Sequence, residues 1–278
     1  MNTKTFILTV LAMITLIACG TKSQKQVPEN DYKVFVLNDV INEGSAELLI
    51  SPDPDTLKKY LPDGTFPLYV NAVLVQKNDS NFLFDTGAGM KLVENLAEKG
   101  VVPENVHKLF ITHCHGDHIG GLLKNEQVVF PNAELFMNKI EHDYWLGEQN
   151  PLFLQVIEKY KNQLQLFEIE EMGKILFPDI FARAAYGHTP GHTMYLIGNE
   201  QQTLIWGDLT HVMPVQMPHP QYSVTFDVNP VQAAETRQEV LKFVAAEKIP
   251  VAGMHIPATV LGKISENGVG GYVFQPFE

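Results

Sequence analysis

The segment from residue 113 to residue 118 reads His-Cys-His-Gly-Asp-His and constrains this chain more than any other feature. It directly follows an apolar run, Leu109-Phe110-Ile111. A strand that ends here would point His113 and His115 to one side and turn Cys114 to the other, toward the core. Imidazole and carboxylate groups are ligands that suit zinc and similar divalent ions. Four of them exceed the needs of one open catalytic ion, so the segment predicts two metals that share one site.

The N-terminal residues predict export. Lys4 precedes an apolar stretch, residues 6–18, which is too short to span a bilayer and is typical of a secretory signal peptide. The stretch runs into Ala18-Cys19-Gly20, which resembles the lipobox of bacterial lipoproteins. The alternative is an ordinary signal with a coincidental cysteine. We expect residues 1–18 to be the signal peptide, and residues 19–31 to be a lipidated Cys19 with a polar, flexible tether.

The expected location follows from this signal. A lipid on Cys19 would hold the protein on a membrane, at the periplasmic face of a bacterial membrane or at the cell surface. Cys114 is then the one remaining cysteine, so no internal disulfide can form. The net charge is −12, and removal of Lys4 with the signal would change it by one, to −13. Such acidity argues against a nucleic acid partner.

Residues 32–278 are expected to form one mixed α/β domain, because β-rich runs alternate with helical patterns and no linker follows residue 31. One predicted helix carries apolar residues from Met90 to Ala97 and ends at Gly100, and another begins at Asn229-Pro230. The predicted strands cover residues 33–37, 69–75, 82–84, 108–112, 128–130, 182–186, 194–197, 203–206 and 249–254.

Polar clusters follow four of these strands, which is where α/β proteins tend to place their sites. The clusters are Asp85-Thr86-Gly87, residues 187–193 (Gly-His-Thr-Pro-Gly-His-Thr), Gly207-Asp208 and Gly253-Met254-His255. Together with residues 113–118, this series resembles the motifs of the metallo-β-lactamase fold superfamily, over essentially all of residues 31–278. The resemblance implies an αββα four-layer sandwich, with two mixed β-sheets face to face, helices outside and a metal pair at one edge.

The resemblance also implies the ligands of two divalent metal ions, expected to be zinc. One ion would be bound by His113, His115 and His192, the other by Asp117, His118 and His255, with Asp208 as a bridge. A water between the ions would attack the substrate as hydroxide. Asp117 would also be catalytic, because its second oxygen could pass a proton to the leaving group.

Other residues are expected around these ligands. Asp85 is predicted to orient a ligand, or else to bond local backbone N–H groups. His188 is predicted to hydrogen-bond within its turn, with contact to a ligand as the alternative. His211 stands three residues after Asp208, where some lactonases have a tyrosine, and is a candidate to line the pocket. The apolar residues of segment 144–153 could wall that pocket or simply pack as helices.

A bridging aspartate at Asp208 favours lactonases and related hydrolases over β-lactamases. The stretch 206–216, with His219-Pro220 and residues 235–237, is similar to the methyl parathion hydrolase group, whose layout many lactonases share. We therefore expect a dinuclear zinc hydrolase of a small-molecule lactone or ester. Acyl-homoserine lactones are favoured, and organophosphate triesters are possible. The alternatives are an exported β-lactamase, a non-catalytic zinc-binding lipoprotein and, without a signal, a cytosolic thioesterase. The natural substrate, the native metal and a possible homodimer stay open.

Overall fold

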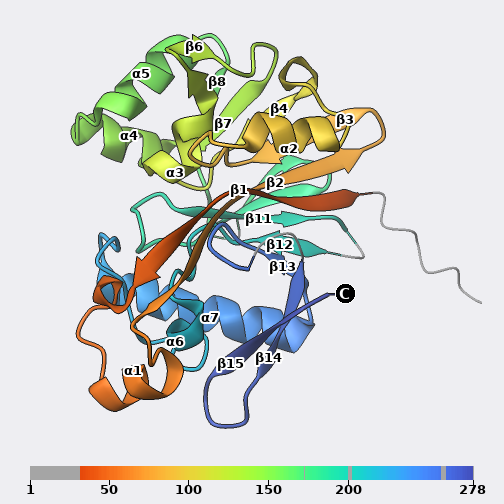
Figure 1. The fold of residues 1–278 in the computed structure, drawn as a ribbon. Coiled ribbons are helices and arrows are strands. Elements are labelled where there is room, and N and C mark those ends of the chain that lie inside the picture. The colour runs from red at the N-terminus through yellow and green to blue at the C-terminus, as the bar shows by residue number, and fades with distance from the viewer. Residues whose placement is uncertain (1–31, 172, 200–201, 258–260, 278) are drawn as a thin grey trace, which may run out of the picture.

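Two β-sheets packed face to face form the centre of the computed structural model, which describes residues 32–171, 173–199, 202–257 and 261–277 (Figure 1). The predicted signal peptide and Cys19 lie outside the described residues. The six strands of the first sheet are, in spatial order, β1 (Lys33–Ser45), β2 (Thr65–Lys77), β3 (Ser80–Phe84), β4 (Lys108–Phe110), β7 (Glu134–Asn138) and β8 (Leu164–Phe167). β1, β2 and β3 are antiparallel neighbours, and β3, β4, β7 and β8 run parallel.

The second sheet has seven strands. They are, in spatial order, β15 (Tyr272–Pro276), β14 (Gly262–Glu266), β13 (Val251–Ala252), β12 (Thr203–Ile205), β11 (Thr193–Ile197), β10 (Ile180–Ala184) and β9 (Lys174–Phe177). β12 and β13 are parallel, so the loops that follow them leave the sheet at the same edge. β5 (Leu123–Lys124) and β6 (Gln127–Val128) form a separate two-stranded sheet.

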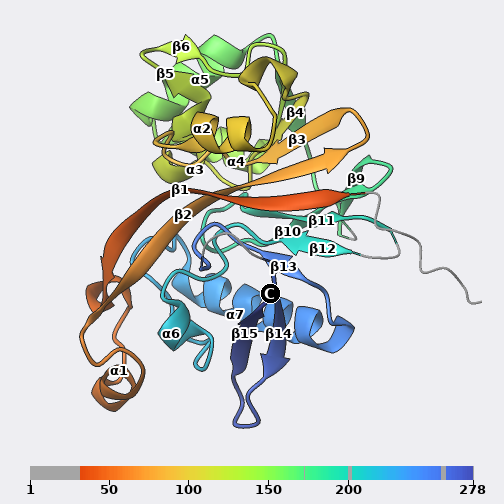
Figure 2. The same ribbon diagram turned by 45° about the vertical axis from the view of Figure 1, so that its right-hand side comes forward.

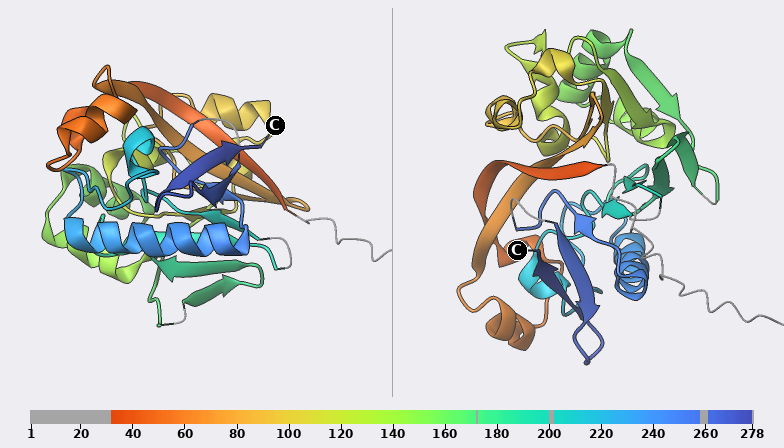
Figure 3. Two further views of the ribbon diagram at one scale, coloured as in Figure 1. Left: turned by 90° about the horizontal axis from the view of Figure 1, so that it is seen from below. Right: turned by 90° about the vertical axis from the view of Figure 1, so that its right-hand side faces the viewer.

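Helices cover the outer faces of both sheets (Figures 1 and 2). The first sheet carries α2 (Leu92–Glu98), α3 (Gly116–Ile119), α4 (Lys139–Gly147) and α5 (Pro151–Tyr160). The second carries α7 (Pro230–Glu247), which lies along it (Figure 3). The short helices α1 (Pro54–Tyr60) and α6 (Met213–Gln216) pack together at one end. No helix among the described residues is both long and apolar enough to cross a membrane.

Apolar side chains of both sheets meet in the central layer. Phe84 and Phe110 of the first sheet stack with ring centroids 4.8 Å apart, and Tyr195 of the second sheet lies 5.5 Å from Phe110. Two further clusters fill the spaces between the sheets and the outer helices. On α7, for example, the buried residues Val240 and Leu241 lie four and three residues before Val244, on one face of the helix. The αββα prediction is therefore confirmed.

Local sequence signals account for several element ends. α7 begins where Asn229 caps the backbone N–H of Gln232 and Pro230 occupies the first turn, as the sequence predicts. The predicted strand at residues 128–130 is wrong beyond Val128, because its partner β5 is only two residues long. Cys114 faces the core as predicted, with its Sγ 3.6 Å from the sulfur of Met137.

Candidate metal centre

Five loops bring the titratable side chains together at one edge of the sandwich. Residues 113–118 follow β4, and Asp85 follows β3, its parallel neighbour. His188 lies between β10 and β11, Asp208 follows β12 and the residues after β13 include His255. Because β3 and β4 are parallel, as are β12 and β13, the ends of these strands converge where the two sheets meet.

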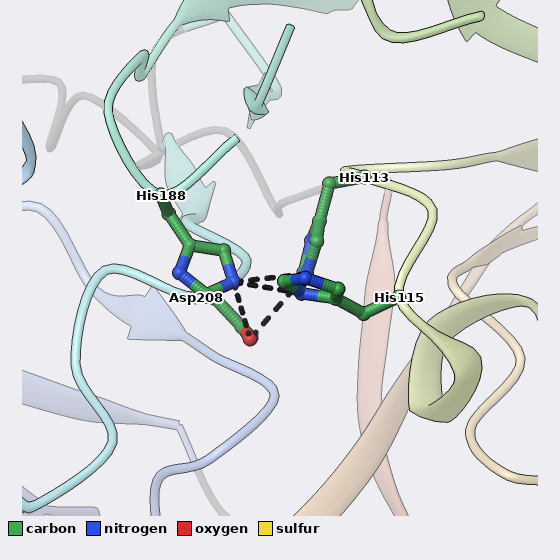
Figure 4. A group of neighbouring side chains, drawn as sticks. All are labelled: His113, His115, His188 and Asp208. Carbon is green, nitrogen blue, oxygen red and sulfur yellow. Dashed lines mark hydrogen bonds and ion pairs between the residues drawn. The ribbon is translucent and has the colours of Figure 1, made fainter. Parts of the chain in front are cut away.

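The first group of possible metal ligands comprises His113, His115, His188 and Asp208 (Figure 4). Nε2 of His188 lies 3.2 Å from Nε2 of His113 and 3.0 Å from Nδ1 of His115. The Asp208 Oδ2 atom lies 3.3 Å from Nε2 of His188 and 3.5 Å from Nε2 of His113. Three ring nitrogens and one carboxylate oxygen thus point at one small volume.

The hydrogen bonds that the other ring nitrogens of these histidines make indicate that a cation fits between the rings. Nδ1 of His188 lies 2.8 Å from the Asp227 carboxylate, and Nδ1 of His113 lies 3.1 Å from the Thr112 hydroxyl oxygen. Thr112 donates its own hydroxyl hydrogen to Asp85 at 2.6 Å, so it must accept from His113. When both rings are neutral, as metal coordination requires, the proton is therefore on Nδ1 of each ring, and the two Nε2 lone pairs face each other. A cation between them would turn this repulsion into coordination.

The electrostatics of His188 agree with a cation at this place. Burial disfavours its charged form, but the hydrogen bonds and negative charges of Asp208 and Asp227 outweigh burial and raise the pKa of His188 to about 9. His115 behaves differently, because burial and the neighbouring His188 lower the pKa of its ring to about 3. Without a metal ion, the positive charge that balances Asp208 and Asp227 is therefore a proton on His188.

The second group comprises Asp117, His118 and His255. Nε2 of His255 lies 3.5 Å from Oδ2 of Asp117, and Nε2 of His118 lies 3.8 Å from its Oδ1. Nδ1 of His118 bonds Asp85 at 2.7 Å, and Nδ1 of His255 donates to the carbonyl of Tyr69 at 2.6 Å. The Nε2 atom of His118 is buried and has no hydrogen-bond partner. A buried ring nitrogen ordinarily has a partner, so this atom fits the role of a metal ligand.

Asp208 lies between the two groups. Its Oδ2 is 3.0 Å from Nε2 of His255, and its Oδ1 is buried without a hydrogen-bond partner, 3.2 Å from Nε2 of His118. Burial would favour the neutral acid, but the charges of His118 and His255 outweigh it and keep the pKa of Asp208 well below its usual range. The Oδ2 atom of this ionised carboxylate thus faces both groups and its Oδ1 faces His118, so Asp208 is placed where two metal ions could share it.

The structure gives His188 and His192 different surroundings. Nδ1 of His192 donates to the carbonyl of Ala185 at 2.8 Å, and its Nε2 accepts from the backbone N–H of Asp208 at 3.0 Å. Both ring nitrogens are thus used, and His192 lies outside both ligand groups. The assignment of His192 as a ligand therefore stays a prediction. The turn between the two histidines carries His188, not His192, toward His113.

Two cavities meet at this edge. The smaller, of about 260 Å³, is lined by Leu68, His115, Gly116, Asp117, Asp208, His211, Phe226 and His255. The larger, of about 640 Å³, is mainly apolar and shares His211 and His255 with the smaller one. His211 therefore lines the pocket, as one of the interpretations of the sequence predicted. Its Nε2 lies 3.0 Å from Asp208, and its Nδ1 is buried without a partner.

Asp85 has the position that the first of its two interpretations predicted. Its carboxylate lies against the ring of His118 and also accepts from the hydroxyl and the backbone N–H of Thr112. By contrast, segment 144–153 mainly packs as helices. Phe153 is fully buried, whereas Trp145 packs edge-on against His115 with ring centroids 5.3 Å apart.

The sequence interpretation missed two residues that contribute to the site. Asp227 orients His188 from 39 positions further along the chain, in a loop with no motif around it. Glu141 is a buried carboxylate on α4 that touches both ligand-bearing loops. An acidic residue in an amphipathic helix is ordinarily a solvated one, so composition offered no signal for Glu141. The neighbouring residues His142 and Asp143 offered no signal for Glu141 either.

The family model of the metallo-beta-lactamase superfamily matches residues 65–248, and the chain belongs to that superfamily. Among solved structures, the chain is similar to AidC, a dizinc quorum-quenching lactonase in complex with a product, N-hexanoyl-L-homoserine. The TM-score is 0.82 and the identity 25%, over 90% of this chain and 95% of that one. It is also similar to the hydrolase AbOPH, with a TM-score of 0.80 and 25% identity over 89% of this chain and 95% of that one.

The curated relatives that match part of this chain in sequence are named ribonuclease Z. Ribonuclease Z of Borrelia garinii subsp. bavariensis is 28% identical over 131 residues, which are 44% of this chain and 40% of that protein. Ribonuclease Z of Streptococcus uberis is 31% identical over 130 residues, 45% of this chain and 41% of that protein. The matches thus span about two fifths of those relatives. The superfamily and the ligand groups define a metal-dependent hydrolase, and the His and Asp clusters suggest a dinuclear metal site.

Proposed function

We propose that this hydrolase binds two zinc ions and cleaves a lactone or ester whose acyl part is apolar, such as an acyl-homoserine lactone. The carrying observation is that Asp208 lies between two groups of possible ligands, beside a cavity that shares His211 and His255 with a large apolar one. The first ion would be held by His113, His115 and His188, and the second by Asp117, His118 and His255. The likeness to a dizinc lactonase supports this choice.

Two bound divalent ions would supply a water of lowered pKa and would polarise the substrate carbonyl. Asp117 lines the smaller cavity, and its side chain is 36% exposed. It could therefore carry a proton to the leaving alkoxide through whichever oxygen faces the cavity. Asp208 and the buried histidines would stay ionised and neutral, respectively, once the ions balance the charge. This leaves Asp117 as the group best placed for proton transfer.

The larger cavity supports an apolar acyl chain. Its walls come from the end of the sandwich where α6 and the hairpin of β14 and β15 meet the end of α1 and the start of β2. They include Tyr60, Phe66, Met213, Met217, Val273 and Phe274. Few polar groups would compensate a charged ligand here, so burial of methylene groups is the main source of affinity.

Three rivals are tested by the same experiment. Ribonuclease activity is suggested by the names of the curated relatives, but the net charge of −12 would repel RNA. A β-lactamase and a non-catalytic zinc-binding protein are the others. The assay measures kcat/KM of the zinc-loaded protein with acyl-homoserine lactones of increasing chain length, p-nitrophenyl esters, a phosphotriester, a chromogenic cephalosporin and a precursor tRNA.

We expect lactones or esters to be the preferred substrates, with KM falling as the acyl chain lengthens. Each buried methylene group should contribute about 0.8 kcal/mol, or roughly fourfold, until the cavity is full. Preference for the cephalosporin or the tRNA would contradict the proposal. No turnover of any substrate together with tight zinc binding would favour the non-catalytic protein.

The Asp208→Ala variant tests the dinuclear site. Loss of the shared carboxylate should lower the zinc content below that of the wild type, measured by atomic emission. Because two metals together supply several kcal/mol of charge stabilisation, kcat/KM should fall by at least about 1,000-fold. Full activity with unchanged zinc content would refute the two-metal site.

We also propose that the protein is exported and anchored by a lipid on Cys19, which lies outside the described residues. The support is the sequence around Cys19. Expression of the full chain with a radiolabelled fatty acid should label the wild type and not a Cys19→Ala variant, and cell fractionation should place only the labelled protein in the membrane. Equal labelling of the two proteins would exclude this cysteine as the anchor.

A further inference from the structure

We propose that Glu141 is a positioning residue that holds the two histidine-bearing loops of the first ligand group at a fixed spacing and thereby sets the metal affinity of that group alone. This inference rests on the proposed two-metal site. Glu141 touches none of the possible ligands itself, so it would act through the backbone and through Trp145.

The two oxygens of the Glu141 carboxylate serve different loops. Oε1 accepts from the backbone N–H of Cys114 at 2.9 Å and from the indole N–H of Trp145 at 2.6 Å. Oε2 accepts from the Thr189 hydroxyl at 2.6 Å and from the backbone N–H of Gly191 at 3.0 Å. One carboxylate thus receives four hydrogen bonds, two from each side.

The bonded atoms lie next to the histidines of the first group. Cys114 separates His113 from His115, so its N–H fixes the backbone that presents both rings. Thr189 directly follows His188, and Trp145 packs edge-on against the ring of His115. A shift of Glu141 would therefore move all three imidazoles relative to one another.

The turn that carries Thr189 and Gly191 packs closely against α4. A Cβ on Gly191 would lie 2.2 Å from the backbone nitrogen of Glu141, so the turn rests directly on α4. Asn138, which caps α4, donates to the carbonyl of Gly191 at 3.1 Å. Glu141 is only 1% exposed, and a buried carboxylate without its donors would be costly. Loss of the carboxylate would likewise leave the four donors without their acceptor.

The second ligand group is held by other residues. His118 bonds Asp85, and His255 donates to the carbonyl of Tyr69. None of the hydrogen bonds of Glu141 is made to Asp117, His118 or His255, or to Asp85 and Tyr69 behind them. Substitution of Glu141 should therefore weaken metal binding at the first ligand group and leave binding at the second group unchanged. General unfolding would weaken binding at both groups.

The Glu141→Gln variant is the sharpest test, because glutamine is of the same size but has a single acceptor oxygen. It can serve one loop, while its amide N–H groups would oppose the donors of the other. Titration of the metal-free full chain with Zn²⁺ in a calorimeter should show two binding steps in the wild type. In the variant one step should weaken by about 10- to 100-fold, as is typical when a group behind a metal ligand is lost.

The matched control is Glu158→Gln, an exposed carboxylate on α5 paired with Lys161, which should leave both steps unchanged. Two unchanged steps in Glu141→Gln, or equal weakening of both, would overturn the inference while the two-metal proposal stands. Absence of two steps in the wild type would overturn that proposal as well.

A second measurement needs no metal. The chain has two tryptophans, and the indole N–H of Trp206 is buried without a partner, whereas that of Trp145 bonds Glu141. In an ¹H–¹⁵N spectrum of the metal-free protein, Glu141→Gln should move the Trp145 signal and leave the Trp206 signal in place. Movement of both signals would indicate general rearrangement and contradict a positioning role.

Discussion

At the scale of single residues, the candidate metal centre depends on the groups behind the histidines. Asp227 stands behind His188, Asp85 stands behind His118, and a backbone carbonyl stands behind His255. Each bond places the proton of a neutral ring on Nδ1 and leaves Nε2 free for a cation. The sites are therefore prepared by hydrogen bonds before any metal arrives.

Asp227→Asn should weaken zinc binding at the group that contains His188. Asparagine has the shape of aspartate, but it carries no charge and can turn its amide nitrogen toward Nδ1, which would place the ring proton on Nε2. We expect a loss of about 10- to 100-fold in affinity for one zinc ion, measured by competition with a chromophoric chelator. The control is Asp179→Asn, whose carboxylate bonds Tyr32 and Lys77 away from the centre. An unchanged affinity in Asp227→Asn would show that His188 is oriented by other means.

The sequence predicted as ligands six of the eight described residues that could hold a metal, but not His188 or His211, which forms a further group with Asp208 and His255. Residues 113–118 are contiguous, and Asp208 and His255 each follow a strand, so their local patterns are specific. His188 and His192 lie in one loop, and only its three-dimensional path decides which ring turns to His113. The same limit hid Asp227 and Glu141, whose contacts span 39 and 27 positions.

At the scale of elements, α5 shows how the outer helices are fixed to the first sheet. Tyr160, at its last position, is fully buried and donates its hydroxyl to the carbonyl of Leu122 at 2.9 Å. The same hydroxyl accepts from the backbone N–H of Phe130 at 3.2 Å. One side chain thus links a helix to the loops that flank β5 and β6.

Tyr160→Phe should change the alkaline stability of the metal-free protein. Burial raises the pKa of Tyr160 from 10.0 to about 12. Between these values the folded chain keeps a proton that the unfolded chain has lost, so this contribution is complete below pH 10 and declines toward pH 12. The shift corresponds to a contribution of up to roughly 3 kcal/mol.

Urea unfolding from pH 8 to pH 12 measures the effect. The variant should be less stable by about 1–2 kcal/mol at pH 8, where two buried backbone groups lose their partner, and the difference should shrink as pH rises. Tyr60→Phe, at the partly buried last position of α1, is the control. A difference that stays constant with pH would mean that the hydroxyl ionises equally in both states.

The elements themselves were predictable in proportion to their local signals. α7 has a capping asparagine, a proline and a long apolar stripe, and both its ends lie close to the prediction. β14 and β15 were missed because they form an edge hairpin in which alternate residues such as Lys263 and Val273 are exposed. Such strands carry no continuous apolar run, and only pairing with β13 makes them part of the sheet.

At the scale of the whole molecule, each ligand group draws on both halves of the chain. His113 and His115 come from loops of the first sheet, whereas His188 and Asp208 come from loops of the second. In the other group, His255 of the second half faces Asp117 and His118 of the first. A metal ion in either group would therefore tie the two sheets together at their shared edge.

Zinc removal should accordingly lower the melting temperature of the whole domain. A ligand present at 1,000 times its Kd stabilises the folded state by about 4 kcal/mol, and each kcal/mol shifts Tm by roughly 2–4 °C in a domain of this size. We expect dialysis against a chelator to lower Tm by about 10 °C in differential scanning calorimetry, and added Zn²⁺ to restore it. Equal melting temperatures with and without zinc would contradict binding across the sheets.

The distribution of these ligands along the chain also bears on how the protein is made. His188, Asp208 and His255 are synthesised long after residues 113–118. A nascent chain would therefore carry an incomplete cluster of histidines until His255 had been added. The proposed centre would be loaded with metal only after that point, in whichever compartment the domain completes its folding.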